Sequence, residues 1–307
     1  MANAADLIEE IPARVLLLGT PGSGKTGSLA CLANAGFKLR VLAFDKRANM
    51  VPLLMYTKPE YRKNIDILFF EDKLRAGQRF IEPIGVPSAF RLAYLAMDHW
   101  KYTTGEHEID LGASRDWGLD TVVVLDSLTA MGQASMRRAM AMANKTPLNR
   151  TQQVWGFAMD DQDNFIEKMV GNDNHFHLVV LSHTKMIGPK EVGKDDNDIT
   201  KAIKTQAADL IVTRFYPNAL GRELPQNIAR HFPATLFIEK IDKGGKIRRM
   251  ISASPRMDID TKLPSIGLPS DLSVESGMVE VFRAMGVKVP PVPNGNSNLQ
   301  EENIEHE

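Results

Sequence analysis

Eight consecutive residues have the types and the spacing needed to hold the phosphates of a nucleotide. They are Gly19-Thr20-Pro21-Gly22-Ser23-Gly24-Lys25-Thr26, and they fit the pattern G-x-x-x-x-G-K-[ST]. Glycine lets backbone N–H groups approach phosphate oxygens, while an ammonium and a hydroxyl suit the β- and γ-phosphates and Mg²⁺. We therefore predict that residues 19–26 bind ATP with Mg²⁺, with Lys25 on the phosphates and Thr26 on the metal.

The residues on either side of this loop favour the structural context that such a loop needs. Residues 13–18 form a short apolar run typical of a strand buried on both faces. Residues 25–35 suit a helix, and Gly36 follows as a common helix stop. A strand before the loop and a helix after it disfavour the alternative, a glycine-rich turn that arose by chance.

A second apolar run ends in a carboxylate that could bind the metal. Residues 121–125 favour a strand, and Asp126 follows directly. Functional side chains gather at the carboxyl ends of parallel strands, where residues 19–26 also begin. We predict that Asp126 joins Thr26 at the Mg²⁺ site. A helix N-cap role for Asp126 is the alternative, and it is compatible with metal binding.

Hydrolysis also needs a carboxylate that orients the attacking water. The residue after Asp126 is Ser127, so this carboxylate must come from elsewhere. Asp45 follows the apolar run 39–44, and Glu71 follows residues 65–70. We favour Asp45 because its strand comes directly after the phosphate-loop helix, although a role in a surface turn stays open. A short Asp reaches less far than a Glu, which predicts slow turnover.

The remaining sequence favours strands that alternate with helices. Strands are expected at residues 13–18, 39–44, 65–70, 121–125, 176–181, 210–213 and 235–238, and helices at 25–35, 51–56, 89–102, 127–143, 151–170 and 271–284. Residues 242–245 suit a tight turn into a returning strand at 247–251. This order predicts an α/β fold with a mostly parallel sheet flanked by helices and a C-terminal β-hairpin.

The composition excludes several other classes of protein. The 307 residues carry 37 Lys and Arg against 38 Asp and Glu, so no overall basic field attracts nucleic acid. One cysteine excludes a disulfide framework. No apolar run reaches the ~18 residues of a membrane span, and the acidic start is unlike a signal peptide, so we expect a cytoplasmic protein. We divide it into an extension at 1–12, one domain at 13–288 and a disordered acidic tail at 289–307.

Residues 122–133, VVVLDSLTAMGQ, resemble the Mg²⁺-binding strand of RecA-like P-loop ATPases, and the order of the elements resembles that core. The segments GTPGSGKT, TQQVWG, LVVLSHTK, ADLIV and KIRR resemble, more narrowly, the phage Sak-type ATPases of single-strand annealing and recombination. The similarity spans residues 13–268. It implies an ATPase that assembles with itself and acts on single-stranded DNA. The activating Glu usual in the family is not evident, and Asp45 stands near its place.

The resemblance also implies roles for two further residues. His183, at the end of LVVLSHTK, stands at the position of a sensor of the γ-phosphate that signals into the loop 186–205. Arg248, together with Lys246, matches basic residues that reach the γ-phosphate of a neighbouring subunit, which implies a homo-oligomer. The alternatives are a buried structural histidine and a hairpin whose surface cations discourage edge pairing.

A local basic patch is the candidate DNA-binding surface. Residues 136–150 hold Arg137, Arg138, Lys145 and Arg150 and no acid, a charge of +4. They follow the Asp-Ser strand, where RecA-like proteins carry a DNA-facing loop, so we predict phosphate contacts there. A solvated helix face is the alternative. If no DNA binds, the chain is a nucleotide switch that regulates a protein or small-molecule partner; a packaging or remodelling motor is the third possibility.

Overall fold

An eight-stranded sheet forms the centre of the molecule. The computed structural model describes residues 11–77, 80–147, 149–187, 214–221, 223–243, 246–252, 261–263 and 268–291. The sheet has the order β14-β13-β12-β1-β9-β8-β2-β3. Its strands are β1 (Arg14–Gly19), β2 (Lys38–Ala43), β3 (Ile65–Phe69), β8 (Thr121–Asp126), β9 (His177–Ser182), β12 (Ala234–Lys243), β13 (Lys246–Ser252) and β14 (Asp271–Ser273).

The pairing of these strands confirms the predicted fold class. All neighbours from β12 to β3 pair in parallel. The strands β12, β13 and β14 pair in antiparallel fashion and extend one end of the sheet. The mostly parallel α/β sheet and the C-terminal hairpin are therefore present as the sequence predicts.

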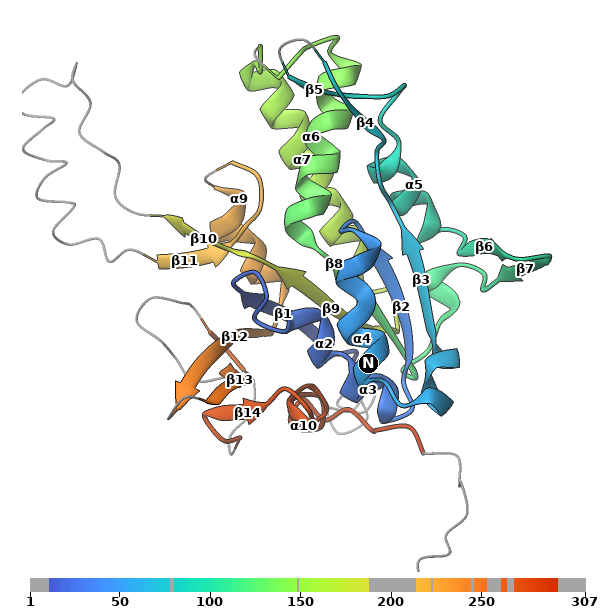
Figure 1. Cartoon of the computed structure of the whole chain (residues 1–307), viewed down its shortest axis with the longest axis vertical. Helices are drawn as coiled ribbons and strands as arrows, with labels where there is room; N and C mark the ends of the chain where they lie inside the picture. The colour runs from blue at the N-terminus through green and yellow to red at the C-terminus, as the bar shows by residue number, and fades with distance from the viewer. Residues whose placement is uncertain are drawn as a thin grey trace, which may run out of the picture.

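Helices cover both faces of the sheet, as Figure 1 shows. They are α2 (Lys25–Ser28), α3 (Ala30–Asn34), α4 (Val51–Tyr56), α5 (Ala89–Ala96), α6 (Leu128–Met142), α7 (Gln152–Val170), α9 (Leu224–Asn227) and α10 (Gly277–Ala284). Short 3₁₀ helices are η1 (Arg47–Met50), η2 (Pro59–Asn64), η3 (Ser114–Asp116) and η4 (Ile228–His231). The central strands β1, β8 and β9 are thus buried on both faces, which permits their continuous apolar sequences.

Two hydrophobic clusters, one on each face, hold these layers together. Successive residues of a strand point to opposite faces, so Val15 and Leu17 pack with α2, α3, α4 and α10. Leu16 and Leu18 pack with α5, α6 and α7 on the other side. The phosphate loop follows β1 in the middle of the sheet, so both clusters anchor it.

Several element boundaries differ from the sequence predictions. The helix expected over 25–35 is divided at Leu29 into α2 and α3. The helix expected over 89–102 ends at Ala96, because residues 101–104 form a strand instead. The helix expected over 271–284 begins at Gly277, because residues 271–273 join the sheet edge as β14. Strand pairing overrides the local helical pattern in the last two cases, through a local hairpin in the first of them and through the edge of the main sheet in the second.

Three two-stranded antiparallel sheets lie outside the main sheet. They are β4 (Leu74–Ala76) with β5 (Ile81–Pro83), β6 (Lys101–Thr104) with β7 (His107–Asp110), and β10 (Thr184–Ile187) with β11 (Arg214–Pro217). The strands β4, β5 and β7 lie outside every element that the sequence predicts, and β6 overlaps the end of the helix expected over 89–102. The β6–β7 hairpin projects from the body in Figure 1.

Some predictions fall on residues that the structure does not describe. These are residues 1–10 of the N-terminal extension, most of the loop 186–205, the strand at 210–213 and residues 292–307 of the acidic tail. Among the described helices, none combines the length and the apolar character that crossing a bilayer requires.

Candidate nucleotide site

The phosphate loop crosses from β1 to α2 in a conformation that favours glycine. Gly22 and Gly24 have φ angles of 72° and 106°, in the region that side-chain-bearing residues rarely adopt. A Cβ on Gly19 would lie 2.6 Å from the carbonyl oxygen of Ile238 on β12. A cleft of about 1110 Å³ opens beside the loop. The backbone is therefore shaped around the cleft, as phosphate binding requires.

Lys25 lies at the base of this cleft with its ammonium against the loop. Its Nζ donates hydrogen bonds to the carbonyl oxygens of Gly19, at 2.8 Å, and Thr20, at 3.0 Å. Burial lowers the pKa of Lys25 to about 8, while the charges of Asp126 and Asp45 oppose that shift. The group remains mostly protonated at neutral pH, so it offers a desolvated positive charge to an anion in the cleft.

Thr26 and Asp126 meet as the sequence predicts. The Thr26 hydroxyl donates a hydrogen bond of 2.7 Å to Oδ2 of Asp126. Burial raises the pKa of the Asp126 carboxyl to about 6, and the nearby charge of Asp45 adds to that effect. A hydroxyl and a carboxylate are the hard oxygen ligands that Mg²⁺ prefers. The donor set therefore fits a Mg²⁺ ion, whose charge would favour the ionised carboxylate.

Asp45 faces the same cleft, held by Ser127. The Ser127 hydroxyl donates a hydrogen bond of 2.9 Å to Oδ2 of Asp45, and Asp45 lines the cleft beside Asp126. Glu71, the other candidate for orienting water, is exposed and absent from the cleft lining. The serine that follows Asp126 thus positions the carboxylate at the end of a neighbouring strand.

His183 completes the polar lining on the β9 side. Its Nδ1 lies 3.3 Å from Nζ of Lys25, and its backbone N–H donates to the Thr129 hydroxyl on α6. Burial, followed by the charge of Lys25, lowers the pKa of His183 below its usual range. The neutral ring of His183 therefore contacts the Lys25 ammonium directly, and His183 is the residue before β10.

The C-terminal hairpin contributes two cations that the sequence analysis did not single out as site residues. Lys240 and Arg249 are paired across β12 and β13. Nζ of Lys240 would lie 3.3 Å from a Cβ on Gly22, and Cδ of Arg249 would lie 2.7 Å from one on Gly24. Both side chains therefore lie against the phosphate loop of their own chain.

Arg248, the residue predicted to serve a neighbouring subunit, is exposed at the rim of the cleft. Its partner across the hairpin is Ile241, so it leaves the strand on the face opposite to Arg249. The side chain of Lys246 lies outside the described part. The alternation of side chains along a strand is enough to predict that Arg248 and Arg249 lie on opposite faces of the hairpin. Which of these faces lies against the phosphate loop is decided only by the pairing of β12 with β1.

The α4 side of the cleft offers a further surface that the sequence analysis missed. Tyr56 and Pro52 line it together with Asn34 and Asn49. The Tyr56 ring is 62% exposed, and a Cβ on Gly27 would lie 3.0 Å from it. An exposed aromatic side chain beside a phosphate loop is suited to stacking on a nucleobase.

Two of the four cations predicted to bind DNA are engaged within the protein. Nε of Arg137 lies 2.8 Å from Oδ2 of Asp72, whose side chain is only 2% exposed. Arg138 forms an ion pair with Asp161 and lies over the ring of Phe90. These carboxylates neutralise much of the charge that the sequence assigned to the patch.

The other two predicted DNA contacts are open to solvent. Lys145 and Arg150 are exposed beyond the end of α6. The guanidinium of Arg150 lies 5.8 Å from the centre of the Trp155 ring, a cation–π distance. Within the described part of the predicted patch, Lys145 and Arg150 thus keep positive charges that are accessible from solvent.

Several solved structures are similar to this chain in overall fold. One is a prototypical ATPase from the type III secretion system of pathogenic bacteria, with a TM-score of 0.39 and 12% identity over 74% of this chain. This chain spans only 51% of that ATPase. A KaiC-like protein from the archaeon Pyrococcus horikoshii gives 0.36 and 11% over 85% of this chain and 88% of its own.

The flagellar accessory protein FlaH from Methanocaldococcus jannaschii has a TM-score of 0.29 and 9% identity, over 79% of this chain and 78% of its own. No protein-family model and no curated protein matches the sequence. At TM-scores below 0.5 these likenesses establish nothing about substrate or partner. The roles of residues therefore follow from the geometry of the cleft alone.

Proposed function

We propose that the chain is a Mg²⁺-dependent ATPase. The observation that carries this proposal is the meeting of Lys25 with the Thr26–Asp126 pair in one cleft beside the glycine-rich loop. Mg²⁺, when bound, would neutralise charge on the phosphate oxygens. Thr26 and Asp126 would hold it, and Lys25 would exchange its loop carbonyl partners for phosphate oxygens.

Asp45 and His183 serve the reacting end of the nucleotide. Asp45, fixed by Ser127, accepts a hydrogen bond from the attacking water and orients it in line with the γ-phosphate. His183, in contact with Lys25, links the occupancy of the site to β10. Tyr56 stacks on the base at the other end of the cleft.

Charge that develops in the transition state is stabilised by the hairpin. Arg249 and Lys240 act within the same chain, since both already lie against the loop. Arg248, at the rim, serves the site of a neighbouring subunit in a homo-oligomer, as the family resemblance implies. The two arginines of one strand thus act on two different sites.

The effector of this ATPase is single-stranded DNA, in recombination or strand annealing. Support comes from the resemblance of the sequence segments to Sak-type ATPases and from the exposure of Lys145 and Arg150. The ion pairs of Arg137 and Arg138 favour the second candidate, a nucleotide switch that acts on a protein or small-molecule partner without DNA.

An ATPase assay with and without single-stranded DNA tests both parts of this proposal, the hydrolysis of ATP and its stimulation by DNA. Wild-type protein should hydrolyse ATP with Mg²⁺, and Lys25→Ala should not. DNA should stimulate the wild type at low salt, and the Lys145→Ala/Arg150→Ala double variant should lose that stimulation but keep its basal rate. Arg115→Ala, which removes an exposed cation elsewhere, is the matched control. Hydrolysis without any DNA effect or DNA binding at low salt would leave the switch as the function.

A further inference from the structure

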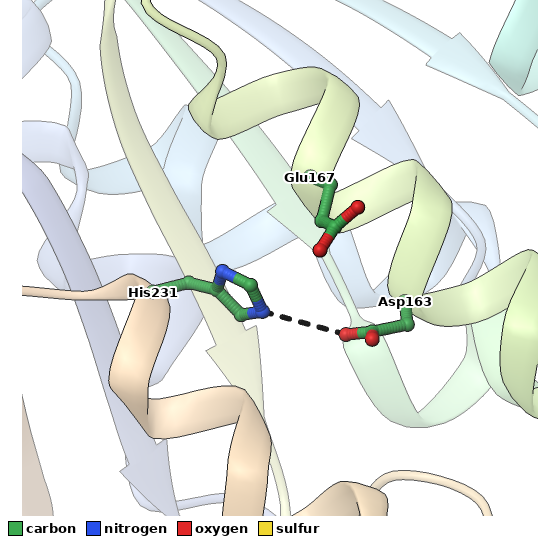
Figure 2. Close-up of side chains that lie close together, drawn as sticks. All are labelled: Asp163, Glu167 and His231. Atoms are coloured by element: carbon green, nitrogen blue, oxygen red, sulfur yellow. Dashed lines mark ion pairs between the residues drawn. The ribbon is translucent and has the colours of Figure 1, made fainter.

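A group of side chains that could bind a metal ion lies away from the nucleotide cleft. Asp163 and Glu167 come from α7, and His231 ends η4 directly before β12 (Figure 2). None of the three lines the cleft. Residues four apart on a helix share a face, so α7 presents two carboxylates to one imidazole.

The three side chains converge on one point. Their potential ligand atoms all lie within 4.8 Å of one another. Nε2 of His231 lies 3.4 Å from Oδ1 of Asp163, and Figure 2 shows the Glu167 carboxylate turned toward the gap between them. Ligands around a tetrahedral Zn²⁺ are separated by roughly 3.4 Å, given bonds of about 2.1 Å. Small side-chain rotations therefore bring all three into coordinating distance.

Two of the converging atoms lack a hydrogen-bond partner within the described structure. Oδ1 of Asp163 and Nε2 of His231 are both shielded from solvent and unsatisfied. Their separation of 3.4 Å is that of an ion pair, without hydrogen-bond geometry. Buried polar atoms left unpaired are costly. A cation between them would satisfy both atoms at once.

Arg230 and Glu167 form part of the surroundings of these two atoms. Arg230 also lies close to the site, and its Nη2 is 4.0 Å from the second oxygen of Asp163, Oδ2. Arg230 therefore lies nearest to Oδ2, whereas His231 faces the other oxygen of Asp163, Oδ1. Glu167 is exposed, so the site is reached from solvent on that side.

We infer that Asp163, Glu167 and His231 form a binding site for a divalent transition metal of the Zn²⁺ type. An imidazole nitrogen with two carboxylates suits Zn²⁺, whereas Mg²⁺ and Ca²⁺ prefer oxygen ligands alone. Three protein ligands leave a fourth position for water. The metal would fasten α7 to the start of β12, the strand that carries Lys240 to the phosphate loop.

Zinc binding to the full-length chain tests this inference independently of ATP hydrolysis. Protein stripped with a chelator is dialysed against Zn²⁺ in an excess of Mg²⁺, and bound zinc is counted per chain. Wild type should retain one zinc and unfold at a higher temperature with it. Glu167→Gln, an exposed change that leaves the core intact, should weaken binding about tenfold or more. His231→Gln should abolish binding.

Two matched histidine variants separate this site from other zinc ligands. His99→Gln disrupts an exposed His–Asp pair that no third metal-ligating side chain joins among the described residues, and His306→Gln removes the histidine among the final acidic residues. Both should keep the zinc. The inference is overturned if wild type binds none, if Glu167→Gln and His231→Gln bind as wild type does, or if His306→Gln loses the metal. ATP hydrolysis by the zinc-free protein would leave the proposed function standing in each case.

Discussion

Lys240 and Arg249 stand opposite each other on the antiparallel strands β12 and β13, and both side chains reach the phosphate loop of their own chain. The parallel pairing of β12 with β1 brings the hairpin beside that loop. The same register turns Arg248 to the other face of β13. Both arginines line the cleft, Arg249 against the phosphate loop and Arg248 at the rim.

We expect Arg249→Ala to reduce kcat about a hundredfold, because it removes a donor aimed at charge that forms in the transition state. Steady-state kinetics measure this effect. Mixing experiments then separate the two arginines. Arg249→Ala mixed with Lys25→Ala should recover no activity, since Arg249 acts within its own chain. Arg248→Ala mixed with Lys25→Ala should recover some, and equal outcomes in the two mixtures would refute the division.

Replacing Asp126 with Asn should have opposite effects on activity and stability. The variant loses a charged Mg²⁺ ligand, so Mg²⁺-dependent hydrolysis should disappear. Burial raises the pKa of Asp126 to about 6, which means that the ionised form is costly in the folded, metal-free protein. Removing that charge should stabilise the nucleotide-free protein by up to about 3 kcal/mol at pH 7. Chemical denaturation without Mg²⁺ checks this, and a clear loss of stability would contradict it.

The affinity for Mg²⁺-nucleotide should peak between about pH 6 and pH 8. The pKa of Asp126 is raised to about 6, so acidification below that value protonates the metal ligand. The pKa of Lys25 is lowered to about 8, so the free protein loses its phosphate-binding ammonium above that value. Titration with a fluorescent ATP analogue across pH measures both limbs. The acid limb should vanish in Asp126→Asn while the alkaline limb persists.

Ser127→Ala should slow hydrolysis and leave nucleotide affinity almost unchanged. The serine hydroxyl donates to Asp45 over 2.9 Å, and it also accepts a hydrogen bond from the backbone N–H of Ala130 as the N-cap of α6. Its loss should lower kcat about tenfold, a fraction of the 10²–10⁴ typical of general base catalysis. Asp45→Asn should lower it further. Combining the two changes should add little to Asp45→Asn alone, and additive losses would show that Ser127 does not act through Asp45.

Local sequence was sufficient to predict the phosphate loop, the Thr26–Asp126 pair and the parallel sheet. Residues 19–26 form a continuous segment whose conformation depends on its own glycines and on a strand and helix beside it. Asp126 ends an apolar strand, and parallel strands bring such ends together regardless of the residues between them. Short-range pattern and one general rule of topology therefore determined this part of the site.

The partners of individual charged side chains were decided by tertiary structure alone. Arg137 meets Asp72, and His231 meets Asp163, only after helices and loops distant in sequence have packed. The selection of Arg249 over Arg248 depends on the register of a hairpin against β1. A charged residue looks alike in sequence whether it faces solvent, an ion pair or a ligand. Its surroundings are set by long-range packing, which no local pattern encodes.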